Sequence, residues 1–260
     1  MQHIGVAEVG LEIDDLTVRF GGNTAVDGAQ FRARPGQITG LIGPNGAGKT
    51  TSFNACSGLL KPTQGTVRLF GEDITGCSPA ERARRGLGRT FQRMQLFESL
   101  NVKDNVAIGL EARLAGNSPL KQLFSSQAER ARLREETEQV LTLCGLEPLR
   151  AEPVAALSTG QRRLVDLARV LAGGFSLLLL DEPSSGLDSA ESRKFGEIVS
   201  RVVAERGCGV LLVEHDMELV MSICTYLYVL DFGKLIFEGT AAEVRGSEVV
   251  RAAYLGSEAG

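Results

Sequence analysis

Short, continuous apolar runs, each ended by a polar or glycine-rich stretch, recur along the chain. Leu177 to Leu180 are four consecutive leucines closed by Asp181. The run Gly209 to Val213 repeats the pattern before Glu214, and Gln37 to Ile42 ends in a glycine-rich loop. Runs of this length are typical of strands buried on both faces of a parallel sheet.

The remaining pattern alternates strands with helices. Leu11 to Phe20 and Gln30 to Arg34 predict an opening antiparallel layer. Further strands are expected at Thr66–Phe70, Leu87–Phe91, Thr225–Asp231 and Leu235–Glu238, and helical segments at Gly48–Leu59, Val102–Ala172 and Thr240–Gly256. Strands that alternate with helices favour an α/β fold with a mostly parallel sheet and ligands at its strand ends. We expect one domain over residues 1–260, with a helical subdomain at about 93–172 and a helical tail at about 240–256.

Composition adds limits on partners and location. Apolar residues make up 43% and the net charge is −4, so a core can form and a nucleic-acid partner is disfavoured. The five cysteines form no CxxC pair, which favours free buried thiols in a reducing cytosol. Met1 to Glu8 lacks the pattern of a secretory signal, and no run approaches the ~20 apolar residues of a spanning helix. We therefore expect any membrane role to depend on a partner.

The glycine-rich loop that follows the run Gln37 to Ile42 fits a phosphate-binding pattern. Gly43 to Thr50 has the spacing GxxxxGK[ST] and falls between a predicted strand and a predicted helix. Such glycines let backbone N–H groups turn toward phosphate oxygens at the positive end of the helix. Lys49 should reach the β- and γ-phosphates, and the Thr50 hydroxyl should hold Mg²⁺. The predicted nucleotide contacts are Gly43, Pro44, Asn45, Gly46, Ala47, Gly48, Lys49, Thr50 and Thr51.

Two further features suit nucleotide chemistry. Asp181, at the end of a buried strand, can hold the shell of Mg²⁺, and Glu182 can polarise an attacking water. Ser158-Thr159-Gly160-Gln161 opens a helix to about Leu171, which either Ser158 or Thr159 can cap. A capped helix is the plain interpretation, although an exposed helix N-terminus can also hold a phosphate.

These motifs together resemble the ATP-binding cassettes of ABC transporters. Leu157 to Gln161 is similar to the LSGGQ signature, with Thr159 in place of its first glycine. The order along the chain also fits, from the phosphate loop through Gln92, the signature and the LLLLDE strand to Ser185–Asp188 and His215. The resemblance covers about Leu11 to Gly256. It implies a phosphate-loop NTPase core with an antiparallel layer and a helical subdomain.

The resemblance also implies roles for individual residues. Phe20 matches the aromatic residue that stacks on adenine, and Gln92 matches the glutamine that contacts Mg²⁺ and the attacking water. His215 matches the switch histidine at the γ-phosphate, and Asp188 the acid at the dimer interface. Residues that match the signature and that we expect at the nucleotide of the opposite chain are Ser158, Gly160 and Gln161. We thus expect ATP and Mg²⁺ as cofactors, with Glu182, His215, Gln92 and Lys49 as the catalytic set.

Finer features are similar to importers of branched-chain amino acids. These features are the run Gly88–Gln92, the insertion with Ser118–Leu120 and Leu123–Phe124, the run Glu214–Met217 and the tail Val250–Gly256. The resemblance implies a peripheral ATPase on the cytoplasmic side of the membrane. Its expected partners are a permease, a second ATPase chain and, indirectly, an extracytoplasmic solute-binding protein. Urea or short amides are an alternative cargo. A soluble ABC ATPase acting on DNA or ribosomes, and a regulator without hydrolysis, are the alternatives from other classes.

Overall fold

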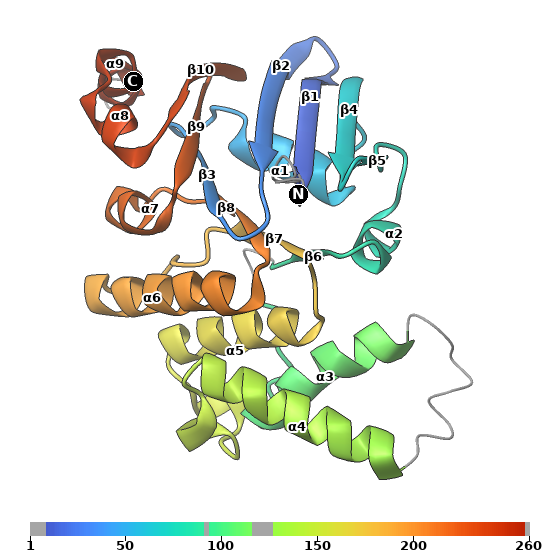
Figure 1. Cartoon of the computed structure of the whole chain (residues 1–260). Helices are drawn as coiled ribbons and strands as arrows, with labels where there is room; N and C mark the ends of the chain where they lie inside the picture. Colours follow the sequence, from blue (N-terminus) through green and yellow to red (C-terminus); the bar gives the residue numbers. More distant parts are fainter. Residues whose placement is uncertain (1–8, 91–93, 116–126, 258–260) are drawn as a thin grey trace, which may run out of the picture.

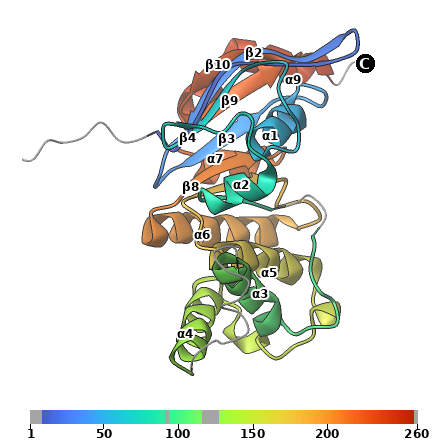
Figure 2. The same ribbon diagram turned by 90° about the vertical axis from the view of Figure 1, so that its right-hand side faces the viewer.

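Two β-sheets and a separate group of helices make up the protein (Figure 1). The computed structural model describes residues 9–90, 94–115 and 127–257. The helical group lies at one end and the sheets at the other, and the same division is visible after a quarter turn (Figure 2).

The smaller sheet is antiparallel and has the strand order β2-β1-β4-β5. Its strands are β1 (Leu11–Phe20), β2 (Asn23–Ala33), β4 (Gln64–Leu69) and β5 (Glu72–Asp73). Phe20 pairs with Asn23 across the turn that joins β1 to β2. Apolar residues on one face of this sheet, among them Ile13, Val26 and Phe31, are buried in a core that also receives α1. The sheet therefore covers the helix that follows the phosphate loop.

The larger sheet has the order β10-β9-β3-β8-β7-β6, and only the β9–β10 pair is antiparallel. Its strands are β3 (Ile38–Ile42), β6 (Leu87–Arg89), β7 (Leu177–Asp181), β8 (Gly209–Val213), β9 (Tyr226–Asp231) and β10 (Lys234–Gly239). Every residue of β3, β7 and β8 is buried. The carboxyl ends of these three strands meet at one edge, which is where ligands bind in such sheets.

The helices fall into two groups. Around the sheets lie α1 (Lys49–Ser57), α2 (Pro79–Arg84), α6 (Ser189–Arg206), α7 (Met217–Ile223), α8 (Ala241–Gly246) and α9 (Glu248–Ser257). The helical region contains α3 (Val102–Ala115), α4 (Gln127–Leu143), α5 (Thr159–Ala172) and the short 3₁₀ turns Glu147–Leu149 and Val154–Ala156. In both views α6 lies between the helical region and the larger sheet (Figures 1 and 2).

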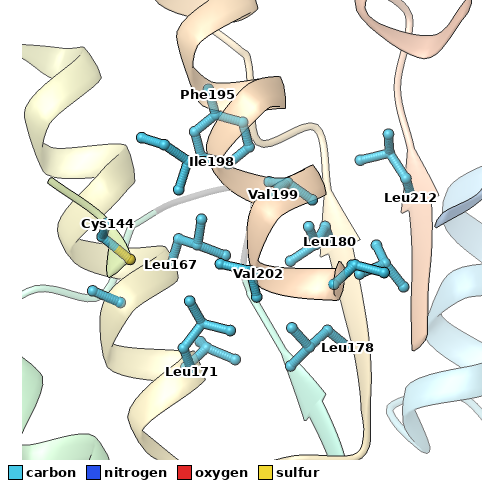
Figure 3. Close-up of a cluster of buried hydrophobic side chains, with 14 of the residues drawn as sticks. Cys144, Leu167, Leu171, Leu178, Leu180, Phe195, Ile198, Val199, Val202 and Leu212 are labelled. Carbon is cyan, nitrogen blue, oxygen red and sulfur yellow. The ribbon is translucent and has the colours of Figure 1, made fainter. Parts of the chain in front are cut away.

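One core joins the helical region to the larger sheet. Leu167 and Leu171 of α5 lie on one side of Val199 and Val202 of α6, and Leu178 of β7 with its neighbours lies on the other (Figure 3). Burying a side chain of this size contributes about 1.5–3 kcal/mol. The helix α5, which begins at the predicted signature, is thereby held in a defined position relative to β7, which carries Asp181.

The structure confirms the α/β fold, with its antiparallel layer, mostly parallel sheet and helical middle. Several predicted strands differ from the observed ones by one or two residues at an end, and β2 differs by more. β2 begins at Asn23 rather than Gln30, because its outer half is mostly exposed and polar and gives no apolar pattern. β6 ends at Arg89, and Phe91 and Gln92 lie outside the described residues. All five cysteines are free, and only Cys77 is not fully buried. No helix of the described ranges is both long and apolar enough to span a membrane.

Candidate nucleotide site

The loop between β3 and α1 forms one wall of a cavity of about 550 Å³. Gly43 has φ +150° and Gly48 has φ +96°. A Cβ at Gly43 would lie 2.1 Å from the carbonyl oxygen of Leu230, and one at Gly48 would lie 2.6 Å from that of Ala25. Only glycine fits at either position. The cavity is lined by Asn23, Thr24, Ala25, Asn45, Gly46, Ala47, Gly48, Lys49, Thr50, Thr51, Glu182 and Phe232.

Lys49 is the basic residue of this cavity. Its buried ammonium donates to the carbonyl oxygens of Gly43 at 2.7 Å and Pro44 at 2.9 Å. Burial lowers the pKa of Lys49, and the charge of Glu182 opposes that shift. These bonds hold the ammonium against the loop's own carbonyl oxygens. The arrangement suits a phosphate anion, which would relieve the desolvation of the charge.

Two adjacent acids at the end of β7 occupy different surroundings. Asp181 is buried and accepts a hydrogen bond from the Arg89 guanidinium at 3.1 Å. Burial raises the pKa of the Asp181 carboxyl, and Arg89 counteracts the shift. Glu182 has φ +45° and lines the cavity. A non-glycine residue in this region is strained, and such strain often marks a functional position. Glu182 lines the cavity together with the phosphate loop, and its charge acts on Lys49.

Two oxygen-bearing side chains at this site suit magnesium. Thr50 lines the cavity, and Asp181 ends β7 directly before Glu182, which also lines it. A hydroxyl and a carboxylate are hard oxygen ligands, which Mg²⁺ prefers. Mg²⁺ keeps several waters and needs few protein ligands. The described residues contain no group of three or more His, Cys, Asp or Glu side chains arranged around a metal. The residues present fit a magnesium ion that is held largely by a nucleotide.

Glu214 links the two segments that follow β7 and β8. Its carboxylate is fully buried and accepts hydrogen bonds from the backbone N–H of Ser184 at 2.7 Å and of His215 at 3.1 Å. The His215 side chain is largely exposed, with Nδ1 3.8 Å from Glu214. Glu214 thus fixes the position of His215 relative to the loop after Glu182. The sequence indicated Glu214 only as an acidic neighbour.

The predicted signature lies outside the cavity. Ser158 caps α5, since its hydroxyl accepts from the Gln161 N–H while the Gln161 side chain accepts from the Ser158 N–H. A Cβ at Gly160 would lie 2.7 Å from a Glu191 carboxylate oxygen. Arg163 donates to the carbonyl of Ser185 at 3.2 Å and so joins α5 to the segment after β7.

The structure brings together only part of the predicted site. Asn45 to Thr51 and Glu182 share the cavity, and Gly43 and Pro44 hold Lys49. Phe20 lies at the exposed end of β1 and does not line the cavity, while Gln92 is not among the described residues. Residues of the site that sequence reasoning missed are Asn23, Thr24, Ala25, Arg89, Glu214 and Phe232. The only indication of Arg89 in the sequence was its place in the run Gly88–Gln92, which is similar to the branched-chain amino acid importers.

Comparison with known proteins agrees with this geometry. The sequence profile of the ABC transporter family matches residues 26–185, and that of the branched-chain amino acid ATP-binding cassette transporters matches residues 234–260. The high-affinity branched-chain amino acid transport ATP-binding protein BraF of Pseudomonas aeruginosa is 37% identical, covering 95% of this chain and 97% of its own. LivG of Escherichia coli K12, which carries the same description, is 34% identical with the same coverage.

Solved structures show the same fold. The ADP conformation of MJ1267, an ATP-binding cassette of an ABC transporter, superposes with a TM-score of 0.82. It is 30% identical and covers 95% of this chain and 99% of its own. Fold and site together define a phosphate-loop NTPase built as an ATP-binding cassette. The chain belongs to the ABC transporter family, in which it is an ATP-binding subunit, and the predicted family and fold class are confirmed.

Proposed function

We propose that this chain binds and hydrolyses MgATP to drive the uptake of branched-chain amino acids through a partner permease. The observation that carries the cargo assignment is the match of residues 234–260 to the branched-chain amino acid cassettes. The names of BraF and LivG point the same way. The tail lies far in sequence from the phosphate loop, so this match is independent of the ATP-binding motifs.

The residues of the cavity supply the chemistry of the proposed ATPase. Amides of the phosphate loop and the Lys49 ammonium bind and orient the β- and γ-phosphates. Thr50 and Asp181 would hold Mg²⁺, which would supply positive charge at the phosphate oxygens. Glu182 accepts a proton from the attacking water, and Gln92 and His215 help to position that water and the γ-phosphate. Positioning and charge stabilisation, rather than covalent catalysis, carry the reaction.

A second ATPase chain completes the site in this proposal. Ser158, Gly160 and Gln161 of one chain contact the nucleotide held by the phosphate loop of the other. Ser158 is exposed at the start of α5, where another chain can reach it. ATP then bridges two chains, and loss of the γ-phosphate releases them, which is an ordered switch of a known type.

The segment after Gln92 is the proposed docking surface for the permease. Phe97 is 50% exposed, whereas Leu96 packs against the core. The Phe97 backbone is fixed by Asn105, whose amide accepts from the Phe97 N–H at 2.9 Å and donates to its carbonyl at 3.0 Å. An exposed aromatic side chain on a fixed backbone suits a protein contact. Docking of a permease on this surface would hold the chain at the cytoplasmic side of the membrane.

Uptake of radiolabelled leucine, isoleucine and valine tests the cargo. Deleting the gene should lower this uptake, restoring the gene should return it, and restoring it as Lys49→Ala should fail. Phe97→Asp should abolish uptake while sparing ATP hydrolysis by the isolated chain. Unchanged branched-chain uptake in the deletion strain, with a fall in urea or amide uptake, would show that the cargo is wrong and the ATPase assignment right.

A further inference from the structure

The turn between β9 and β10 carries an exposed aromatic residue at the edge of the nucleotide cavity. Phe232 is 87% exposed, more than any other large apolar side chain in the part of the chain that the structure describes. It nevertheless lines the same cavity as Lys49 and Glu182. Burial therefore does not explain an aromatic residue at this position.

The backbone at Phe232 is strained. Its φ is +43°, in the left-handed region that costs an L-residue roughly 1–2 kcal/mol relative to the right-handed one. Glycine adopts this conformation freely, and the next residue is Gly233 at φ +80°. The exposed ring gains little packing to offset the strain. Strain that persists without a packing gain points to a role for the side chain.

The same turn is fastened to the phosphate loop. The Gly233 N–H donates to the carbonyl of Ala47 at 3.1 Å, and the Asp27 N–H donates to the carbonyl of Gly233 at 2.8 Å. A Cβ at Gly233 would lie 2.8 Å from the carbonyl oxygen of Ala25. Lys234 and Asp27 add an ion pair at 3.3 Å. The position of Phe232 is thus fixed relative to the loop that would hold the phosphates.

We propose that Phe232 packs against the adenine base of bound ATP. This inference rests on the proposed nucleotide site, because the phosphate loop fixes the phosphates and leaves the base to extend toward the cavity edge. Every base has an apolar π-face on which an aromatic ring stacks favourably. Asn23, which pairs with Phe20 across the hairpin, lines the same cavity. The adenine subsite then draws on the β9–β10 turn as well as on the β1–β2 hairpin, which carries Phe20.

Substitution by glycine separates this role from a structural one. Phe232→Gly removes the ring and also relieves the left-handed strain, so the thermal midpoint should stay the same or rise. Affinity for MgATP, measured by calorimetry, should fall about 5- to 150-fold, which corresponds to the stacking of one base on an aromatic ring. Affinity for magnesium tripolyphosphate, which has no base, should not change. Phe232→Tyr should keep the affinity for MgATP.

The matched control is Val249→Ala. Val249 is 55% exposed on α9 and does not line the cavity, so neither ligand should be affected. Equal MgATP affinity in Phe232→Gly and wild type would overturn the proposal and leave Phe232 as a contact for another protein or a membrane. Parallel losses for MgATP and tripolyphosphate would overturn it too, by showing a disturbed phosphate loop. Failure of the wild type to bind MgATP would instead overturn the nucleotide site itself, and this proposal with it.

Discussion

Two helix N-termini in this chain, those of α1 and α5, begin at motifs that the sequence predicts to meet phosphate, and the two ends differ. α1 begins after Gly48, which provides no side-chain cap, and its first turn opens into the cavity. α5 begins after Ser158, whose hydroxyl forms a reciprocal capping box with Gln161. The first N–H groups of α1 thus donate to no capping side chain, whereas at α5 the Gln161 N–H already donates to the Ser158 hydroxyl.

The difference bears on how each end would meet a phosphate. An uncapped helix end on a concave wall is an anion site in the single chain. The α5 end is capped by its own chain, and Ser158 is exposed there, so this end can add contacts to an anion that another molecule brings to it. The comparison therefore supports the proposed division of labour, in which α1 binds ATP and α5 closes over the ATP of a second chain.

Glu182→Gln should have the largest effect and would locate the chemistry at the α1 end. The change keeps the shape of the side chain but removes the general base, so turnover should fall by about 10²–10⁴-fold. MgATP binding should persist and hold a stable dimer, visible by size exclusion. Turnover equal to wild type would exclude Glu182 as the base.

Mixing two inactive variants would test the sharing of sites between chains. Ser158→Arg should leave ATP binding by the monomer nearly intact and lower turnover about 10²–10³-fold, the usual effect of losing one donor to a transition-state charge. Lys49→Ala should be inactive as well. Each mixed dimer has one intact loop facing one intact signature, so mixing should restore about one working site per heterodimer. Absence of rescue at every mixing ratio would contradict the shared site.

Glu214→Gln should weaken the link between the two segments after β7 and β8. Glutamine has one acceptor oxygen where the carboxylate has two, so either Ser184 or His215 loses its partner. The free energy of unfolding should fall by about 1–3 kcal/mol, as measured by urea denaturation. Glu197→Gln, an exposed position on α6, is the control and should change stability by less than about 0.5 kcal/mol. A stable Glu214→Gln protein would show that the carboxylate is not the connection.

Thr159→Gly should have the smallest effect. It restores the more usual glycine of the signature at an exposed position. Gly186 does not crowd the Thr159 methyl group, since even a Cβ added to Gly186 would lie 3.4 Å from it. The side chain takes no part in the capping box, so turnover should change by no more than about twofold. A steady-state phosphate-release assay measures this. A tenfold or greater change would show that the α5 end depends on more than Ser158 and Gly160.

Local patterns predicted much of the fold and part of the site. β1 was predicted with its observed bounds, and the buried runs became β3, β7 and β8. These elements depend on periodicity and burial, which neighbouring residues encode. α2 was missed because it is six residues long. α6 was not singled out, although Asp188 and Glu191 form a capping box at its start.

The sequence by itself determined the phosphate loop, because its glycine spacing and its lysine act within eight residues of chain. It also determined the acids at the end of β7, since the run of four leucines stops at Asp181 and Glu182. Only the tertiary structure decided that Glu214 joins two segments, that Arg89 pairs with Asp181 and that Phe232 reaches the cavity. The Arg89–Asp181 pair joins residues 92 positions apart, and Phe232 lies still farther along the chain from the phosphate loop. These relations arise from strand order and packing, which no local pattern records.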